Sequence, residues 1–577
     1  MKNPLQKLPT RRGFLGALGV GSVAACADTA SLSFSAKNES RSGQFAHGVS
    51  SGDPFSDSVI LWTRVTPDTE GPVELVWEID QDANFKSLSA SGNVTTNASK
   101  DYTVKVEATG LQAGTWYFYR FRIGETVSQI GRTRTLPNGS LQAARFAVVS
   151  CSNWQHGYFN AYDHIARQAE GDAFDALIHL GDYYYEYGIE DAPKLPDRAH
   201  LPPHEIITLK DYRTRHAQYR SDSTLQDVTA KMPLIAVWDD HETTNDSWKG
   251  GAENHNSDEG DWDIRREAAL RAYYEWMPLR EPKFGRSRNE IYRAFEWGDL
   301  ASIVCVETRL TARAEQIIVE DYIDQIDTPG GAEKFKKDIL NAPNRDMLGK
   351  EQQEFIVDTF KASKAKGTSW RLLANQVIMG RLLTPDFTPY IDESALETIE
   401  QDWAGVRDFL TLSKYNVPVY PDSWDGYPVA RNAFYNALSD ADIHDMLVLT
   451  GDAHEFWVNE LTTENHEKMG VELVTSSVSS QTLTAYLGEA TADHNLLLTQ
   501  SNQDARYYNA LVNGYIDLSL TQKKAKVKMV GISTVLSRDY EAFDAARFTL
   551  RKSKDTIKVT APKGLNFKQR LLFAGLG

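Results

Sequence analysis

From about residue 140 onward, the sequence contains four short, mainly apolar runs that end abruptly in polar or charged side chains. The runs are Phe146–Val149, Ala176–Leu180, Leu234–Trp238 and Met446–Leu449. A strand that is apolar throughout is buried on both faces, so helices must cover the sheet that it joins. The pattern therefore predicts a layered α/β domain over residues 140–577. In such a domain, ligands gather at the carboxyl ends of the strands.

Residues 41–136 follow a different pattern, which is rich in β-branched and aromatic residues and divided by turn sequences. The strand-like stretches are Val59–Val65, Val73–Ile79 and Trp116–Arg122. Leu111–Tyr117 is typical of the tyrosine corner of an immunoglobulin-like β-sandwich. We therefore expect a small N-terminal β-sandwich domain before the larger one. Segments 312–350 and 381–420 are expected to be insertions around the mouth of the site.

The first 27 residues have the composition of a cleavable export signal. A positively charged head is followed by the apolar stretch Phe14–Ala25, and the head contains Lys2, Lys7, Arg11 and Arg12. The run Thr10–Leu15 matches the twin-arginine type of signal, whose machinery carries folded proteins. We therefore expect a periplasmic or extracellular protein that folds, and takes up any cofactor, before export.

Cys26 allows two interpretations of the end of this signal. Val23–Cys26 resembles a lipobox, which would place a lipid anchor on Cys26. Ala25–Ala27 also resembles an ordinary signal-peptidase site, which would release a protein without an anchor. The sequence leaves both open.

The net charge argues against nonspecific binding to nucleic acid or anionic membranes. The formal charge is −17, and loss of the four positive charges in residues 1–27 makes it −21. Such an acidic chain repels polyanions, so no nucleic-acid-binding surface is implied. Besides Cys26, the only cysteines are Cys151 and Cys305, which excludes a disulfide framework. Cys305 lies in the apolar stretch Ser302–Val306 and is expected to be a packed core thiol.

Residues whose side chains can bind metal ions lie at the ends of the four apolar runs. The residues are Cys151; Asp182 and Tyr185; Asp239, Asp240 and His241; and Asp452 and His454. One strand that ends in Asp is unremarkable, because Asp often caps the following helix. Four such ends predict a shared metal site. Carboxylates suit hard cations, imidazole suits borderline cations, and thiolate or phenolate favours a strongly polarising ion such as ferric iron.

The spacing of these residues resembles that of metallophosphoesterases. Gly181-Asp182-x-x-Tyr185 resembles the GDxxY motif of purple acid phosphatases. Asp240-His241-Glu242 and Gly451-Asp452-Ala453-His454 fall where calcineurin-like metallophosphoesterases have Asn-His-Asp/Glu and Gly-His-x-His.

A closer resemblance, from about residue 41 to beyond residue 530, is to the PhoD-like family of alkaline phosphatases and phosphodiesterases. The motifs that carry it, in order, are Gly48–Pro54, Ser150–Ser152, Leu180–Glu186, Trp238–Glu242, Asn245-Asp246, Gly251–His255, Ala374–Val377, Trp424–Tyr427 and Gly451–His454. The resemblance implies a four-layer αββα metallophosphoesterase domain.

The resemblance also implies a ligand set for Fe3+ and for one or two Ca2+ ions. The ferric ligands would be Cys151, Asp182, Tyr185 and His454. The candidate calcium ligands are Asp182, Asp240, Asn245, Asn375 and Asp452. Where the family often has Asp-Thr-Arg, this chain has Glu307-Thr308-Arg309, which leaves the role of that segment open.

Such a centre would hydrolyse small-molecule phosphate esters by activating water, whose pKa falls from ~15.7 to ~7 or below on a metal. His241 is the candidate general acid for the departing alkoxide, with a hydrogen bond to Asp182 as its alternative role. Arg215 and His255 are candidate phosphate contacts, or else scaffold residues. The one Gly-x-Ser-x-Gly sequence, Gly48–Gly52, lies in the predicted β-sandwich domain, and no P-loop is present, so the sequence gives no support for a covalent serine mechanism.

We therefore predict an exported monomeric phosphatase that acts on phosphate monoesters, diesters or both. A phospholipase D-like phosphodiesterase on the same fold is one alternative. A catalytically silent surface binding protein is the other, and it would be expected to lack some of the ligands.

Overall fold

The computed structural model describes residues 42–560 except 172–173, 190–194, 284, 390, 403–404, 419, 485–490 and 503. The predicted export signal and Cys26 therefore lie outside the described residues. Residues 41–577 form one compact unit. Within the described part of the chain, no helix is both long and apolar enough to cross a membrane.

The largest sheet contains ten strands, of which the four central ones run parallel. In spatial order they are β26 Thr556–Val559, β25 Ala542–Ser553, β24 Lys524–Ile532, β23 Asn513–Thr521, β11 Ala143–Val149, β12 Ala176–His179, β13 Leu234–Ala236, β2 Val49–Gly52, β3 Ser58–Arg64 and β7 Thr103–Thr109. The register pairs Val149 with His179, and His179 with Ala236. The ends of β11, β12 and β13 therefore lie side by side.

A second sheet of seven strands faces the first. Its order is β16 Arg293–Trp297, β17 Ala301–Cys305, β18 Trp370–Ala374, β19 Met446–Thr450, β21 Lys468–Val474, β20 Phe456–Thr462 and β22 Ala505–Asn509. One buried cluster contains Phe146 and Ile178 from the ten-stranded sheet together with Ile303 and Leu447 from this one. Cys305 lies in the same cluster as a free buried thiol, as the sequence predicts.

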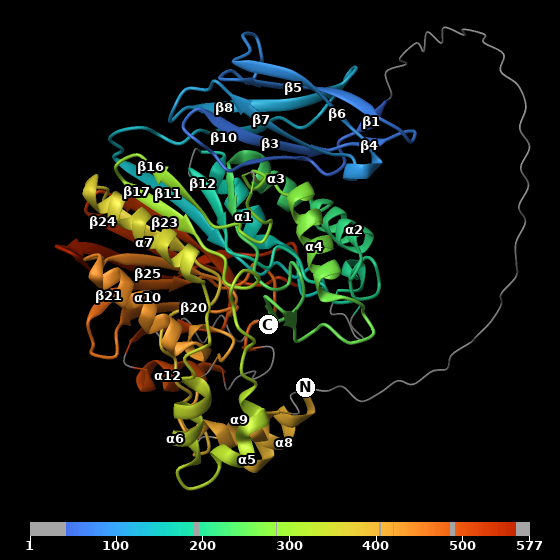
Figure 1. Ribbon diagram of the computed structural model, residues 1–577. Helices are drawn as coiled ribbons and strands as arrows, with labels where there is room; N and C mark the ends of the chain where they lie inside the picture. Colours follow the sequence, from blue (N-terminus) through green and yellow to red (C-terminus); the bar gives the residue numbers. More distant parts are fainter. Residues whose placement is uncertain are drawn as a thin grey trace, which may run out of the picture. The chain divides into compact units, whose positions relative to one another are not determined.

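Helices cover the outer face of each large sheet (Figure 1). The ten-stranded sheet packs against α1 Asn160–Ala169, α2 Leu209–Arg220, α3 Ser223–Lys231 and α4 Trp262–Trp276. The seven-stranded sheet packs against α7 Lys350–Ala365 and α10 Pro428–Asp440. In β11, Phe146 and Val148 face the inner cluster, whereas Ala147 and Val149 face the helices. This burial on both faces is why the predicted strands are apolar throughout, and the mixed α/β fold is confirmed.

The helices on the ten-stranded sheet begin where side chains cap free main-chain N–H groups. The Thr208 hydroxyl accepts from Asp211 N, whose carboxylate accepts from Thr208 N, so α2 starts with a capping box. The carboxylates of Asp222 and Asp261 cap α3 and α4 in the same way.

The N-terminal strands are divided between two sheets. A five-stranded sheet contains β10 Gly131–Arg134, β8 Trp116–Ile123, β5 Val73–Asp80 and β6 Ala90–Thr96, with β9 Thr126–Val127 paired to β8. It packs face to face against β2, β3 and β7 through the cluster that contains Leu61, Val104, Leu75 and Phe121. The hydroxyl of Tyr117 accepts from Gln112 N at 2.8 Å, the contact that the predicted tyrosine corner requires. Because β2 also pairs with β13, hydrogen bonding continues from the N-terminal strands into the sheet of the larger domain.

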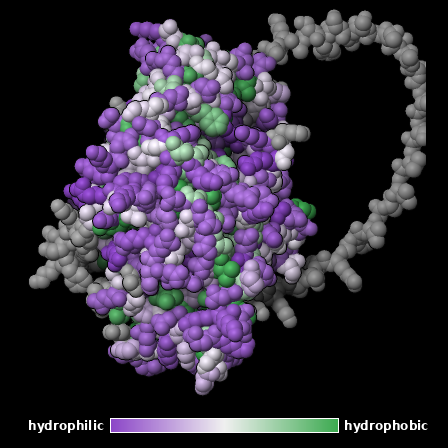
Figure 2. All heavy atoms as spheres, turned by 60° about the vertical axis from the view of Figure 1, so that its left-hand side comes forward, coloured by the Kyte–Doolittle hydropathy of each residue, from purple (hydrophilic) through white to green (hydrophobic). Residues whose placement is uncertain are grey.

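The two predicted insertions contain short helices. These are α5 Ile323–Ile326 and α6 Gly331–Phe335 in the first, and α8 Glu393–Asp402 and α9 Val406–Ser413 in the second. α5, α6 and α9 contribute Ile326, Phe335 and Leu412 to one small buried cluster. The remaining elements are α12 Thr491–Ser501 and two short strand pairs, β1 Gly43–Gln44 with β4 Thr66–Pro67 and β14 Ser247–Trp248 with β15 Gly251–Ala252. Figure 2 shows one face of the molecule, on which hydrophilic residues dominate and hydrophobic ones form small separate spots.

Candidate metal centre

The predicted strand-end residues turn sharply as they leave their strands. Cys151, Asp182, Asp452 and His454 all have left-handed backbone conformations, with φ between 54° and 63°. This conformation is uncommon for residues other than glycine and concentrates at functional sites. Gly181 precedes Asp182 with φ of 106°, and a Cβ there would lie 2.4 Å from Asp239 Cβ. The turn after β12 therefore needs glycine to let the next strand end come close.

Three overlapping groups of side chains could each hold a metal ion, because the ligand atoms within each group lie within 4.8 Å of one another. The groups are Cys151, Asp182 and His454; Asp182, Asp240 and His241; and Asp239, Asp240 and Asp452. Asp182 belongs to the first two, and Asp240 belongs to the last two. The strand-end residues therefore form one continuous cluster, in which Asp182 and Asp240 are the shared carboxylates.

Tyr185 completes the first group. Its hydroxyl donates to Asp182 Oδ2 at 3.2 Å, lies 3.0 Å from His454 Nε2, and accepts from Ser480 Oγ at 2.7 Å. The His454 ring is held from its other side, because Nδ1 lies 2.8 Å from the Gln481 carbonyl. The four candidate ferric ligands are thus brought together from β11, β12 and β19.

The electrostatics of the first group favour a bound cation. Burial, followed by the charge of Asp182, raises the pKa of both the Cys151 thiol and the Tyr185 phenol well above their usual values. Burial is also the main cause that raises the pKa of Asp182 itself. A multivalent cation reverses this effect, because it stabilises the deprotonated ligands directly.

The hydrogen bonds of the buried carboxylates test independently whether these side chains fit a metal ion. Asp182 Oδ1, Asp239 Oδ2 and Asp240 Oδ1 are buried and have no hydrogen-bond partner among the described residues. Buried carboxylate oxygens are almost always satisfied, so three such oxygens in one cluster fit a site that binds a cation. The residues present fit a metal centre with oxygen, nitrogen and sulfur donors.

Arg309 lies inside the acidic cluster, and the sequence left its role open. Its buried guanidinium pairs with Asp239 at 2.5 Å, Asp422 at 2.8 Å and Asp452 at 3.4 Å. Glu307 shapes the turn that presents it, because Oε1 accepts from the main-chain N–H groups of Arg309 and Leu310. Arg309 follows the end of β17, so the strand-end rule that located the other residues could have located it too.

Arg309 also changes the charge state of its neighbours. Although burial acts to raise it, the pKa of Asp240 is held well below its usual value by Arg309 and His241. Asp240 is therefore ionised and ready to bind a cation. Asp422 was also missed by the sequence reasoning, and it belongs to no strand end.

His241 is held by Glu186 in a buried contact. Its Nδ1 lies 2.7 Å from Glu186 Oε2, and the Tyr185 ring lies 4.1 Å from the imidazole. Glu186 is fixed in turn by hydrogen bonds from Thr244 Oγ1, Asn245 N and Asn254 Nδ2. Although burial acts to lower it, the pKa of His241 is raised well above its usual value by the Asp240, Glu186 and Asp182 carboxylates.

Glu242 joins two of the strand ends and was not among the predicted site residues. Its carboxylate accepts from the main-chain N–H groups of Asp182, Tyr183 and Asp239 at 3.1, 2.6 and 2.8 Å. Burial raises the pKa of Glu242 to about 8. This side chain fixes the spacing between Asp182 and Asp239 without being part of the ligand groups.

The two predicted asparagine ligands lie at the edges of the cluster. Asn375 follows β18, is fully buried, and has Nδ2 3.3 Å from Thr450 Oγ1, two residues before Asp452. Its Oδ1 accepts from Trp424 Nε1 at 3.4 Å. Asn245 donates from Nδ2 to Glu253 at 3.2 Å. Neither side chain contacts the shared carboxylates, so their roles as ligands stay predictions.

Arg215 and His255 are not brought into the cluster. The buried guanidinium of Arg215 donates to the carbonyls of Leu201, Tyr185 and Tyr187, so it supports the segment that follows Tyr185. Its N–H groups already have main-chain partners, which fits the scaffold role that the sequence left open, and its role as a phosphate contact stays a prediction. The His255 imidazole lies 3.4 Å from Glu259 and 3.4 Å from Arg265, and its ring packs near Trp262.

A mixed α/β fold with candidate metal ligands at converging strand ends defines a class of hydrolase, and the comparisons identify the family. A family model described as "PhoD-like phosphatase" matches residues 146–529, and its N-terminal domain model matches residues 29–137. The chain is 34% identical over 499 residues to alkaline phosphatase D of Bacillus subtilis (strain 168), which covers 84% of this chain and 76% of the relative.

One solved structure supports the same family. The structure described as "Structure of PhoD" has a TM-score of 0.73 and 29% identity, and the match covers 92% of this chain and 97% of that one. GAP50, "the anchor in the inner membrane complex of Plasmodium", matches with a TM-score of only 0.32 at 10% identity, covering 75% of this chain and 95% of that one. The chain belongs to the PhoD-like phosphatase family and is a phosphoric ester hydrolase, which confirms the family resemblance found in the sequence.

Proposed function

We propose that this chain is an exported, metal-dependent phosphatase that hydrolyses small-molecule phosphate monoesters, diesters or both. The observation that carries the proposal is the sharing of Asp182 and Asp240 among three adjacent ligand groups. Three buried oxygens of these groups, Asp182 Oδ1, Asp239 Oδ2 and Asp240 Oδ1, have no hydrogen-bond partner among the described residues. Shared carboxylates of this kind can hold two or more cations close enough to act on one phosphoryl group.

We infer that Cys151, Asp182, Tyr185 and His454 hold Fe3+, because this group contains the only thiol and phenol of the cluster. Asp182, Asp240, Asn245, Asn375 and Asp452 are the residues that would hold one or two Ca2+ ions. When bound, such ions polarise phosphoryl oxygens and lower the pKa of water. The two asparagine side chains would have to turn toward the carboxylates.

The chain's own residues supply positioning and proton transfer. Glu186 orients His241 through Nδ1, and a ring nitrogen of His241 lies within 4.8 Å of carboxylate oxygens of Asp182 and Asp240. His241, kept protonated by this acidic surrounding, is proposed as the acid that protonates the departing alkoxide. Arg309 is proposed to offset the mutual repulsion of Asp239, Asp240 and Asp452 until cations bind.

The remaining parts of the proposal come from the sequence. Residues 1–27 would direct the folded chain to the twin-arginine machinery, and the enzyme would act as a monomer in the periplasm or outside the cell. Whether Cys26 receives a lipid anchor stays open. The fold is proposed to be an immunoglobulin-like sandwich followed by the four-layer αββα domain, which the packing of the two large sheets between helices supports.

The proposal is tested by turnover of p-nitrophenyl phosphate and of its bis-ester after chelation and readdition of metals. Chelated protein is expected to be inactive toward both esters, and iron plus calcium is expected to restore hydrolysis. Activity that survives complete metal removal would contradict the proposal. The ratio of the two rates decides between a monoesterase and the phosphodiesterase alternative.

A further inference from the structure

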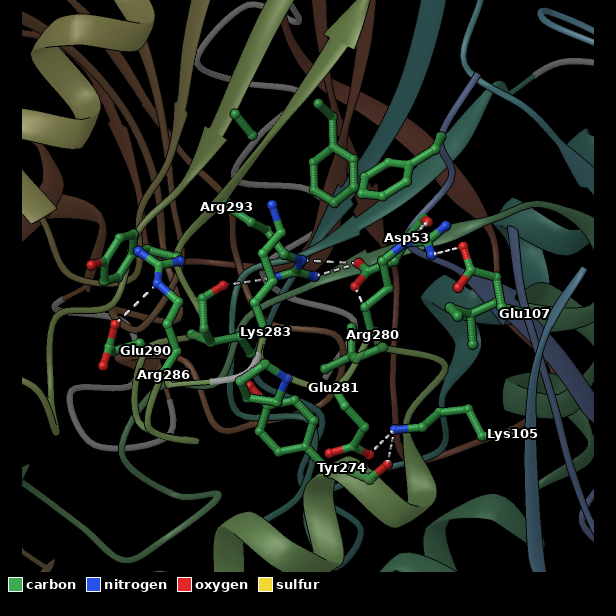
Figure 3. Close-up of a pocket in the computed structure, with 18 of the residues that line it drawn as sticks. Asp53, Lys105, Glu107, Tyr274, Arg280, Glu281, Lys283, Arg286, Glu290 and Arg293 are labelled. Carbon is green, nitrogen blue, oxygen red and sulfur yellow. Dashed lines mark hydrogen bonds and ion pairs between the residues drawn. The ribbon is translucent and has the colours of Figure 1, made fainter. Parts of the chain in front are cut away.

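A cavity of about 720 Å³ lies between strand β7, the segment that follows α4, and strand β16 (Figure 3). Its volume is typical of sites for small molecules, which often lie where domains meet. None of the residues that line it belongs to the ligand groups of the metal centre. The phosphatase activity therefore does not explain this cavity.

Aromatic rings form much of the cavity wall. Phe55, Tyr274, Tyr292, Phe295 and Phe355 line it from four different segments of the chain. Phe55 is 40% exposed, which is unusual for so large an apolar side chain. Flat apolar walls of this kind favour a ligand with a flat apolar body.

Four of the five rings each have a cation placed against them. Arg280 lies 3.8 Å from the Phe55 ring, Arg286 4.5 Å from Tyr292, Arg293 5.3 Å from Phe295 and Lys105 5.5 Å from Tyr274. Each cation is within the range of a cation–π contact, so the rings and the cations stabilise one another.

Each of these four cations is also neutralised by its own carboxylate, as the dashed lines in Figure 3 show. The pairs are Arg293 with Asp53, Lys105 with Glu281, Arg286 with Glu290, and Arg280 with Glu107. The Arg293–Asp53 pair is 2.7 Å long, and Asp53 is almost fully buried. The lining is therefore held in place before any ligand arrives.

Lys283 is the fifth cation of the lining, and it differs from the others. No ion-pair or hydrogen-bond partner of its ammonium group is found among the described residues, and no dashed line reaches it in Figure 3. The lining thus contains five cations and four carboxylates. A single negative charge would neutralise it, whereas a dianion would meet repulsion from Asp53, Glu107, Glu281 and Glu290.

We propose that this cavity is a binding site for a small organic monoanion with a flat aromatic body, separate from the metal centre. The aromatic body stacks against Phe55 and Tyr292, and the anionic group pairs with Lys283. This inference does not rest on the proposed phosphatase mechanism.

The test uses anilinonaphthalene sulfonate, an aromatic monoanion, titrated by calorimetry into the full-length, metal-loaded protein. One saturable site is expected. Lys283→Glu reverses the unpaired charge at an exposed position, and Phe55→Ser removes an exposed stacking surface, so both variants should fold. Each is expected to weaken binding ~3-fold to ~10-fold, as the size of one stacking or ionic contact implies.

Matched controls lie outside the cavity. Lys366→Glu and Leu536→Ser change an exposed lysine and a 47% exposed apolar residue and should leave the affinity unchanged. Neutral phenylnaphthylamine, which has the rings without the sulfonate, should bind more weakly, and saturating inorganic phosphate should not displace the probe. The proposal is overturned if the probe does not bind, if phosphate displaces it, or if the cavity variants behave like the controls.

Discussion

The phenol oxygen of Tyr185 lies 3.0 Å from Nε2 of His454, although 269 residues separate them in the sequence. Tyr185 follows β12 of the ten-stranded sheet, and His454 follows β19 of the seven-stranded sheet. The candidate metal centre therefore exists only where the ends of strands from both sheets meet. Folding of the whole domain, and no smaller part, creates the ligand set.

The two cysteines give a matched test of the proposed iron site. Both are buried free thiols, but only Cys151 lies among the ligand groups. Cys151→Ser is expected to lose iron, together with the visible charge-transfer colour of a ferric thiolate or phenolate centre and most of the activity. Cys305→Ser should keep all three. Absorption spectra and iron content check this, and equal iron in the two variants would remove Cys151 from the centre.

The proposed acid role of His241 predicts a dependence on the leaving group. His241→Gln should lower kcat for an alkyl phosphate by ~100-fold to ~10,000-fold, the usual contribution of a general acid. The loss should be much smaller for p-nitrophenyl phosphate, whose leaving group needs no proton.

His255→Gln is the control for this experiment, because His255 pairs with Glu259 and Arg265 instead of the ligand groups. It should not discriminate between the two substrates. A His241→Gln variant that slows both substrates equally would instead support the alternative in which His241 only orients Asp182.

Arg309 is expected to stabilise the protein when metals are absent. Replacing it by Met leaves Asp239 without its buried cation, whereas Asp422 keeps Arg313, and this should lower the free energy of unfolding by ~3–5 kcal/mol in the presence of a chelator. Added calcium should restore part of this loss, because a cation can take over the neutralising role. Chemical denaturation with and without calcium measures both effects.

Arg407→Met provides the comparison for Arg309. Arg407 pairs with Glu393 and Glu400 but is 44% exposed, so its removal should cost no more than ~1 kcal/mol. If Arg309→Met lowers the free energy of unfolding in chelator by no more than Arg407→Met does, Arg309 does not neutralise the acidic cluster as proposed.

A buried histidine away from the metal centre predicts acid sensitivity. Burial lowers the pKa of His216 from 6.5 to about 3, and its ring stacks on Trp276 with neither ring nitrogen hydrogen-bonded. Because the folded-state pKa is the lower one, this contribution to stability is complete above pH 6.5. It is lost as the pH falls toward 3, by up to ~1.4 kcal/mol per pH unit.

His216→Phe should therefore reduce the slope of the free energy of unfolding against pH between pH 6 and pH 4. The reduction should be roughly the slope that the uptake of one proton on unfolding produces. Tyr273→Phe is the control, because its ring lies 6.1 Å from His216 and burial raises its pKa, so it does not titrate there. An unchanged slope in His216→Phe would show that His216 does not charge on unfolding.

The sequence predicted the core of the site because its chemistry follows the hydrophobic pattern. Cys151, Asp182, Asp240 and Asp452 each end or follow an apolar run, and parallel strands place such ends at one edge. Arg309 also follows a strand, β17. A positively charged side chain is not expected among metal ligands, so this position did not lead to a predicted place in the site. Asp422 lies in an irregular segment before α10, where no periodicity gives a position.

The structure departs from the expectation in two further places, and the hydrophobic pattern of the sequence does not contain the physical cause of either. β2 and β3 satisfy the pattern of a separate sandwich, yet their hydrogen-bonding edges join β13 and the large sheet. Alternation fixes which face of a strand is buried, but not which strand lies beside it. The sequence likewise gave no sign that four main-chain carbonyls would accept hydrogen bonds from the Arg215 guanidinium.

The metal content of the full-length protein, purified after folding in its own host compartment, tests the central claim most directly. We predict one iron per chain bound through Cys151, Asp182, Tyr185 and His454, and one or two calcium ions beside it. Protein that contains neither iron nor calcium, and that neither metal activates, would contradict the account.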